Sequence, residues 1–311
     1  MCIVMLLLWL DMFFSRHFIY PLFVISGILI GYNFDVNKYN CQDFIKKKFK
    51  QLMVPYYIYG AIDCVIYAIV SPSLFIDYKG FISEILYYLL GMRNVDKYYF
   101  TGALWFLTTM FLSQILFNYL IQYPAYVNII MTIIFVMIAY IQNGLRYSLP
   151  LNADLLPYAY PFLCSGYFAK KYRVGEKVGK HPFIFTTMSI VFVFMLSNRN
   201  FVDIFAREFG KKGITVFFVC GLVGSIGLVG VSKIIERYFL QEIKHIFIYI
   251  GRNSLTIMAV HQQWIIHPLN ALGVMFDKEI VNFLFRYWSS LIGSIIVCKT
   301  LLKLKKHVNA P

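Results

Sequence analysis

The stretch IGRNSLTIMAVHQQWIIHP, residues 250–268, decides the fold class because it sets polar groups inside a long apolar run. An apolar run of about 17–25 residues is long enough to cross a bilayer as a helix. The polar residues within this run are Arg252, Asn253, Ser254, His261, Gln262 and Gln263. We therefore predict a transmembrane helix near 245–266 whose polar side chains have partners or a role, since polar groups are costly in lipid.

The composition of the whole chain supports a membrane protein. Of the 311 residues, 59% are hydrophobic and only 14% are charged, and the mean hydropathy is +0.66. Soluble domains carry about 25% charged residues. The net charge of +14 is typical of lysines and arginines that lie in cytoplasmic loops beside anionic lipid headgroups. We expect the lipid bilayer as a partner and no nucleic acid, because no basic stripe accompanies a soluble fold.

The apolar runs predict an all-α bundle of about ten transmembrane helices in one membrane domain, residues 1–311. We place the helices near 2–15, 18–34, 52–71, 103–121, 125–142, 155–169, 182–197, 213–230, 245–266 and 283–302. The amphipathic segment 80–91 is too short to span and is expected at the interface or as a re-entrant piece. With a cytoplasmic N-terminus, the inside segments hold more than half of the 29 basic residues. We therefore predict that both termini are cytoplasmic.

Cysteine spacing gives no sign of a metal site. The six cysteines lie far apart, and none forms a CxxC pair or a cluster with histidine. We expect neither bound metal nor a disulfide framework.

Two polar features near the N-terminus allow a structural and a functional interpretation. Pro21, Ser26 and Gly27 interrupt the apolar run 15–31, which favours a kinked, tightly packed helix. The lysine run 46–48 precedes an apolar span and is typical of a positive-inside anchor. The same lysines would also attract a phosphate-bearing cytosolic ligand, but a charge run alone does not show this.

Two further polar features lie later in the chain. Asn152 and Asp154 precede an apolar helix, so they are expected either to cap it or to contact a hydroxylated substrate at the outer face. Ser254 and His261 are seven residues apart, which places them on one helix face about 10.5 Å apart. A histidine within the membrane is a candidate functional group.

These segments, in this order, resemble the acyltransferase 3 family of integral membrane acyltransferases. The matching segments are PLFVISGILIGY (21–32), FIKKKFKQLMVPYY (44–57), GALWFLTTMF (102–111), LNADLLPYAYPFLCSGYFAKKY (151–172) and IGRNSLTIMAVHQQWI (250–265). Each motif is weak alone, but five in register make a specific match. The segment 151–172 looks most similar to the subgroup that includes fucose 4-O-acetylase.

The resemblance implies transfer of an acetyl or other acyl group from acyl-CoA to a sugar hydroxyl of a cell-surface or exopolysaccharide. It implies a multi-pass protein of the cell membrane (plasma or inner membrane) with no bound cofactor, using acyl-CoA, foremost acetyl-CoA, as donor and a carbohydrate as acceptor. The chemistry requires a general base for the hydroxyl and a donor for the oxyanion. We expect His261 as the catalytic group. The expected substrate-binding residues are Arg252 for the donor phosphates, Ser254, and Trp105, Asn152 and Asp154 on the acceptor side.

One departure from the family concerns the first span. The family's presumed catalytic histidine ends that span and an arginine precedes it, whereas MCIVMLLLWLDMFF (1–14) contains neither. We therefore expect either an N-terminally incomplete chain or a member that has lost this histidine. The alternative functions are a catalytically degenerate binding or scaffold protein and a polysaccharide-unit transporter.

Overall fold

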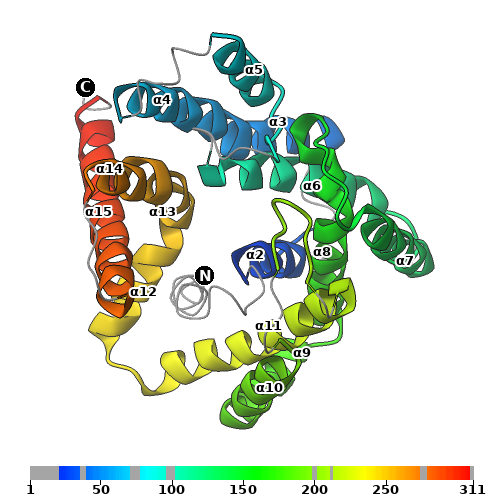
Figure 1. Ribbon diagram of the computed structural model, residues 1–311. Coiled ribbons are helices and arrows are strands. Elements are labelled where there is room, and N and C mark those ends of the chain that lie inside the picture. Colours follow the sequence, from blue (N-terminus) through cyan, green and yellow to red (C-terminus); the bar gives the residue numbers. More distant parts are fainter. Residues whose placement is uncertain are drawn as a thin grey trace.

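The computed structural model describes residues 21–35, 40–70, 78–95, 102–197, 202–210, 213–273 and 279–308. Every regular element in these ranges is a helix, and the sole strand-like feature among them is an isolated bridge between Asp203 and Glu208. The predicted all-α fold is therefore confirmed. In Figure 1, helices α11 to α15 curve along one side of the molecule, α3 and α4 lie along another, and α2 lies beside α8.

The helices follow the apolar runs of the sequence. In chain order they are α2 (Pro21–Tyr32), α3 (Cys41–Lys48), η1 (Phe49–Met53), α4 (Val54–Val70), α5 (Tyr78–Leu89), η3 (Gly102–Leu104), α6 (Trp105–Leu120), α7 (Ala125–Gln142), η4 (Pro150–Leu155), α8 (Leu156–Lys171), α9 (Val174–Lys180), α10 (Pro182–Ser197), α11 (Gly213–Tyr238), α12 (Gln241–Arg252), α13 (Ser254–Val260), η5 (His261–Ile266), α14 (His267–Ala271) and α15 (Glu279–Val308). The segments η1 and η5 are π-helical.

Four described helical stretches are long and apolar enough to cross a bilayer: Cys41–Val70, Gly102–Leu120, Ala125–Gln142 and Gly213–Tyr238. A fifth is added if Val174–Lys180 and Pro182–Leu196, which are bent by 104°, form one span. The predicted span 2–15 lies outside the described residues. The remaining predicted spans coincide with helices that do not pass the same test, so the predicted number of ten is not confirmed.

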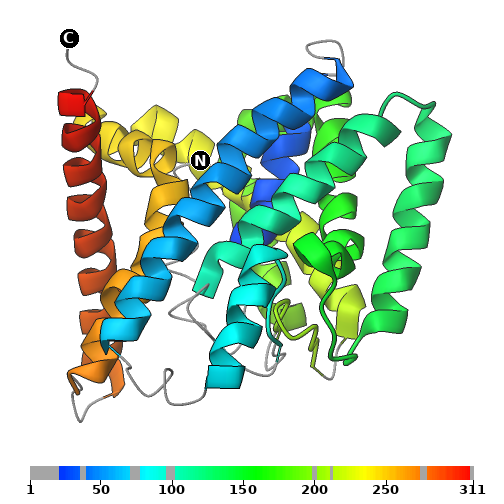
Figure 2. The ribbon, with the colours of Figure 1, turned by 90° about the horizontal axis from the view of Figure 1, so that it is seen from above.

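Two helices at opposite edges of the molecule expose many apolar side chains (Figure 2). Helix α7 stands at one edge in Figure 2, and only 11% of its length is buried against the rest of the chain. Helix α15 stands at the other edge, where Trp288, Ile292 and Ile296 are about half exposed. Side chains of this kind are stable facing lipid, as the membrane assignment requires.

The core forms where α2 and α8 touch backbone to backbone. A Cβ atom added to Gly31 would lie 1.9 Å from the carbonyl oxygen of Leu163. One added to Gly166 would lie 2.0 Å from the carbonyl oxygen of Ile28. Small residues let membrane helices approach this closely, so the two glycines fix the distance between α2 and α8.

The close packing predicted around Ser26 and Gly27 is present in this helix pair. A Cβ added to Gly27 would lie 3.0 Å from the Cβ of Phe162 on α8. Pro21 is the first described residue of α2, so the kink predicted there stays a prediction. Helix α2 therefore packs closely against α8, and its residue Ser26 lines a cavity.

The predicted span 245–266 differs from the structure, because two helices meet there. Helix α12 ends at Arg252, and Asn253 donates a side-chain hydrogen bond to the carbonyl of Tyr249 at 2.8 Å. The backbone N–H of Asn253 also donates to this carbonyl, at 3.2 Å, and α13 starts at Ser254. Figure 2 shows α12 along one end of the molecule and α13 to α14 running down from it.

Candidate functional site

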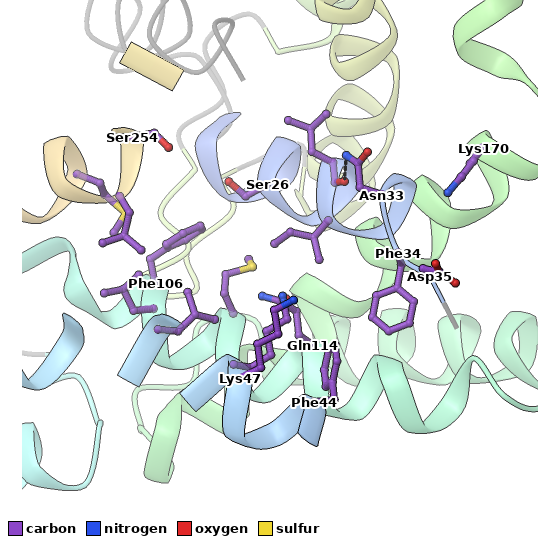
Figure 3. Close-up of a pocket in the computed structure, with 18 residues that line it drawn as sticks. Ser26, Asn33, Phe34, Asp35, Phe44, Lys47, Phe106, Gln114, Lys170 and Ser254 are labelled. Carbon is purple, nitrogen blue, oxygen red and sulfur yellow. Dashed lines mark hydrogen bonds between the residues drawn. The ribbon is translucent and has the colours of Figure 1, made fainter. Parts of the chain in front are cut away.

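A cavity of about 610 Å³ lies where α2, α3, α6, α8 and α13 approach one another. It is lined mainly by apolar side chains, as ligand pockets usually are, with a smaller set of polar groups. These polar groups include Ser26, Asp35, Lys47, Lys48, Gln114, Lys170 and Ser254. In Figure 3, Lys170 and Asp35 lie at one end and Ser254 at the other, with Lys47 and Gln114 between them.

The helical period of α3 determines which lysines reach the cavity. Asn40 caps the helix by accepting a hydrogen bond from the backbone N–H of Asp43 at 2.8 Å. Phe44 is buried and anchors one face, and the ammonium of Lys48 lies 5.4 Å above its ring. Lys47 and Lys48 line the cavity, whereas Lys46 and Lys50 are exposed and do not. The lysine run is therefore divided between a pair that lines the cavity and a pair that is exposed.

Gln114 is the most unusual polar group in this cavity. It sits on α6, is 2% exposed, and its Oε1 atom has no hydrogen-bond partner among the residues described. A buried unsatisfied amide oxygen costs about 1–3 kcal/mol. Because this side chain lines the cavity, a ligand with an N–H or O–H group there would satisfy it. The sequence offered one signal for this residue, a glutamine within the apolar run of 103–121.

His261 lies one turn beyond the cavity, three residues after the lining residue Met258. Its Nδ1 atom is 2.7 Å from the carbonyl oxygen of Met258 and 3.2 Å from that of Ile257. Because carbonyl oxygens only accept hydrogen bonds, Nδ1 carries the hydrogen and Nε2 keeps its lone pair. This tautomer can accept a proton at Nε2, which is what a general base requires.

The residues expected to act with His261, Arg252 and Ser254, do not lie with it along one wall of the cavity. Ser254 lines the cavity, but His261 does not, so their shared helix face does not bring both to one wall. Arg252 is exposed at the end of α12 and does not line the cavity. The roles assigned to Arg252, Ser254 and His261 stay predictions.

Asp154 lies in a buried ionic cluster. Its Oδ2 atom accepts hydrogen bonds from Arg93 Nη2 at 2.5 Å and from Arg207 Nη1 at 2.9 Å. All three side chains are 0% exposed. Its Oδ1 atom accepts from the backbone N–H of Leu149 at 2.9 Å. Two of the basic residues outside the predicted cytoplasmic segments are therefore neutralised in part within the protein.

Asn152 joins the same cluster from a left-handed backbone conformation, with φ of 53°. Its amide group donates to Thr108 Oγ1 at 2.7 Å and lies 3.4 Å from the carbonyl oxygen of Trp105, and its Oδ1 accepts from Arg93 at 3.0 Å. The three residues expected on the acceptor side, Trp105, Asn152 and Asp154, are thus brought together.

None of these three residues lines the cavity. Neither Asn152 nor Asp154 caps α8, because Leu155 is its N-cap residue and no side chain supplies a cap bond. Their contact with an acceptor stays a prediction, while their role in the buried cluster is directly visible. The arginine partners could not be identified from the sequence, because they lie 61 and 53 residues from Asp154.

Metal chemistry gains no support from the part of the chain that the structure describes. No group of three or more His, Cys, Asp or Glu side chains there could hold an ion. The first span, where the family's histidine is expected, lies outside the described residues.

Comparison with known proteins settles the family. Residues 3–302 match the acyltransferase 3 family, described as an acyltransferase domain. The chain belongs to this family. The match covers nearly the whole chain, confirms the family predicted from the five motifs, and supports a membrane acyltransferase. The subgroup of fucose 4-O-acetylase is not confirmed, and neither curated proteins nor solved structures give a match.

Proposed function

We propose that this protein moves an acetyl or other acyl group from acyl-CoA to a hydroxyl of a cell-surface or exopolysaccharide sugar. In this proposal it is a cell-membrane protein (plasma or inner membrane) of about ten spans with both termini cytoplasmic. The donor enters the lysine-lined cavity from the cytosol, and the carbohydrate comes from the opposite side. The sugar acceptor follows from the resemblance to the acyltransferase 3 family.

The cavity is the observation that carries the proposal. Lys47, Lys48 and Lys170 give its lining three positive charges, against one negative charge from Asp35. Coenzyme A carries phosphate groups, which form strong charge-assisted hydrogen bonds with ammonium groups. A volume of about 610 Å³ lies within the range of small-molecule sites.

The apolar side of the cavity suits the rest of the donor. Phe106, Leu107 and Met258 line it on α6 and α13. An acyl-pantetheine arm is apolar with a few amide groups, and the unpartnered oxygen of Gln114 is placed to accept from an amide N–H. The thioester would then point toward Met258, the residue that also binds the ring of His261.

In the reaction, Nε2 of His261 takes the proton from the acceptor hydroxyl. The hydroxyl oxygen attacks the thioester carbonyl carbon, the carbon–sulfur bond breaks, and the thiolate of coenzyme A receives the proton from His261. Atoms and charge balance without a cofactor. Ser254 contacts the donor inside the cavity, Arg252 attracts the donor phosphates from outside it, and Trp105, Asn152 and Asp154 shape the acceptor side.

The experiment measures binding of acetyl-CoA to purified protein in detergent by isothermal titration calorimetry. We compare wild type with Lys47→Gln/Lys48→Gln and with the control Lys46→Gln/Lys50→Gln. Both double variants remove two positive charges from the same stretch, but only the first pair lines the cavity. We expect at least tenfold weaker binding for the first variant, because each charged hydrogen bond contributes about 1.5–3 kcal/mol. The control should stay within threefold of wild type.

Equal affinity for the two double variants would contradict the donor site. Transfer is measured separately, as polysaccharide O-acetylation in cells at equal protein level. There, His261→Ala should fall well below wild type. Wild-type protein that binds acetyl-CoA and transfers nothing would favour the catalytically degenerate alternative.

A further inference from the structure

Asp63 is a carboxylic acid buried in the membrane-spanning stretch Cys41–Val70. It is 0% exposed, and its Oδ1 atom accepts a hydrogen bond from the indole N–H of Trp264 at 2.6 Å. Its Oδ2 atom has no partner within the described ranges. If Asp63 is ionised, Oδ2 has no donor from which to accept a hydrogen bond. If Oδ2 is protonated, its O–H group has no acceptor. In either state one hydrogen bond is therefore not made.

Such a group is expensive to keep. An acidic side chain at the centre of a membrane helix is unfavourable, and one neutral partner does not offset that cost. Position 63 stands within the apolar run IYGAIDCVIYAIV, where a leucine would be more stable. Among the described residues, the bond from Trp264 is the only hydrogen bond of the Asp63 side chain, which points to Trp264 as the reason for the acid.

Trp264 belongs to the π-helical segment η5, which begins at His261. π-Helical turns are rare and are frequently found at functional sites. The neighbouring residue Gln263 packs closely on Gly102, where an added Cβ would lie 2.8 Å from its Nε2 atom. Gly102 itself has φ of 41°, a backbone conformation that favours glycine.

Helix α4 contacts the chain on both sides of His261, in α13 and in η5. Tyr59 and Asp63 are four residues apart and therefore share one face of α4. The hydroxyl of Tyr59 donates to Thr256 Oγ1 at 3.3 Å, five residues before His261. Asp63 accepts from Trp264, three residues after it. The ring of Tyr59 also lies 6.1 Å from that of Trp264, edge to face.

We propose that Asp63 is a positioning residue that acts through Trp264: its carboxylate fixes the π-helical segment and so sets the direction of the His261 ring. Only the activity measurement below rests on the proposed function. The bond itself can be tested in the purified protein without any substrate.

The variants are Asp63→Asn, Asp63→Leu, Trp264→Phe and the double variant Asp63→Leu/Trp264→Phe. Asparagine keeps an oxygen that accepts from the indole N–H, and leucine removes it. Trp288→Phe on the exposed face of α15 is the matched control for loss of an indole. Protein yield and elution on size-exclusion chromatography establish that each variant folds.

For acyl transfer we expect kcat of Asp63→Leu and of Trp264→Phe to fall at least tenfold, with KM for acetyl-CoA within twofold. Asp63→Asn should retain at least half of the wild-type kcat. The double variant should be no slower than the slower single variant, because both changes remove the same bond. A variant that was merely less stable would lose protein yield instead and would not be rescued by asparagine.

The substrate-free measurement is the ring N–H band of Trp264 in the ultraviolet resonance Raman spectrum, obtained as the difference between wild type and Trp264→Phe. The proposal requires a strongly hydrogen-bonded indole in wild type and Asp63→Asn, and a weakly bonded one in Asp63→Leu. A weakly bonded indole in wild type would overturn the proposal even if transfer is observed. A wild type without transfer but with the bonded indole would overturn the proposed function and leave the bond established.

If Asp63→Asn loses kcat as completely as Asp63→Leu while its indole stays bonded, positioning through Trp264 is wrong. The free carboxylate oxygen would then act on the substrate directly.

Discussion

Replacing Asp154 by asparagine removes the negative charge that two buried arginines share. The Oδ2 atom of Asp154 lies 2.5 Å from Arg93 Nη2 and 2.9 Å from Arg207 Nη1, and no part of these side chains is exposed. Removing one partner of a buried ion pair costs about 3–5 kcal/mol, because the remaining charge stays buried. We therefore expect Asp154→Asn to lower the free energy of unfolding by about that amount.

The assay is thermal unfolding of purified protein in detergent, followed by light scattering and intrinsic fluorescence. A loss of 3–5 kcal/mol corresponds to a fall in Tm of at least about 6 °C by the scaling of soluble domains. Glu208→Gln is the control, because Glu208 pairs with Arg146 at 2.9 Å but both side chains are about half exposed. Exposed pairs contribute less than about 1 kcal/mol, so this variant should change Tm little.

The reasoning is refuted if Asp154→Asn unfolds within the error of Glu208→Gln. A variant that keeps its Tm yet loses acyl transfer would instead favour the predicted contact between Asp154 and the acceptor.

Two further predictions concern packing. Gly31→Ala should abolish the monodisperse folded peak in fluorescence-detected chromatography, because its Cβ would lie 1.9 Å from the carbonyl oxygen of Leu163. The control Gly224→Ala should be neutral, because the nearest atom to its added Cβ lies 3.6 Å away. Similar yields for the two variants would contradict this account. Tyr160→Phe should lower the free energy of unfolding by about 1–3 kcal/mol, because it removes the 2.8 Å hydrogen bond that the buried Oδ1 of Asn128 accepts. An unchanged Tm in thermal unfolding would show that this oxygen finds another donor.

Much of the helical framework could be predicted from apolar runs alone. The predicted span 125–142 coincides with α7, and the short segment at 80–91 is the helix α5. These succeed because a lipid-facing helix has to be apolar along its whole length, which leaves a local signal in the sequence.

The rest depends on contacts between distant segments. The end of α12 at Arg252 could not be identified, because residues 245–266 form one predominantly apolar run in the sequence. The ionic partners of Asp154 come from two different loops, and no local pattern links them. From the sequence alone, Gly31 could not be distinguished from Gly27. Only the packing of α8 shows that Gly31 lies closer to the α8 backbone.

The candidate cavity could not be predicted from the sequence. The lysine run was typical of a membrane anchor and left a phosphate-bearing ligand as an alternative, and only the packing of α3 shows that Lys47 and Lys48 line the cavity. Asp63 did leave a signal, as an ionisable residue inside an apolar run, and its partner Trp264 lies 201 residues away. The sequence therefore indicates which polar groups are unfavourable in a membrane, and the structure shows which residues they contact.

The most direct test of the central claim uses sealed membrane vesicles from cells that make the protein and its polysaccharide, with labelled acetyl-CoA added outside. The account predicts incorporation of label into polysaccharide with inside-out vesicles, where the lysine-lined cavity faces the added donor. It predicts little incorporation with right-side-out vesicles and with inside-out vesicles carrying Lys47→Gln/Lys48→Gln. Equal incorporation in both orientations, or none in either, would contradict a transferase that takes its donor from the cytosol.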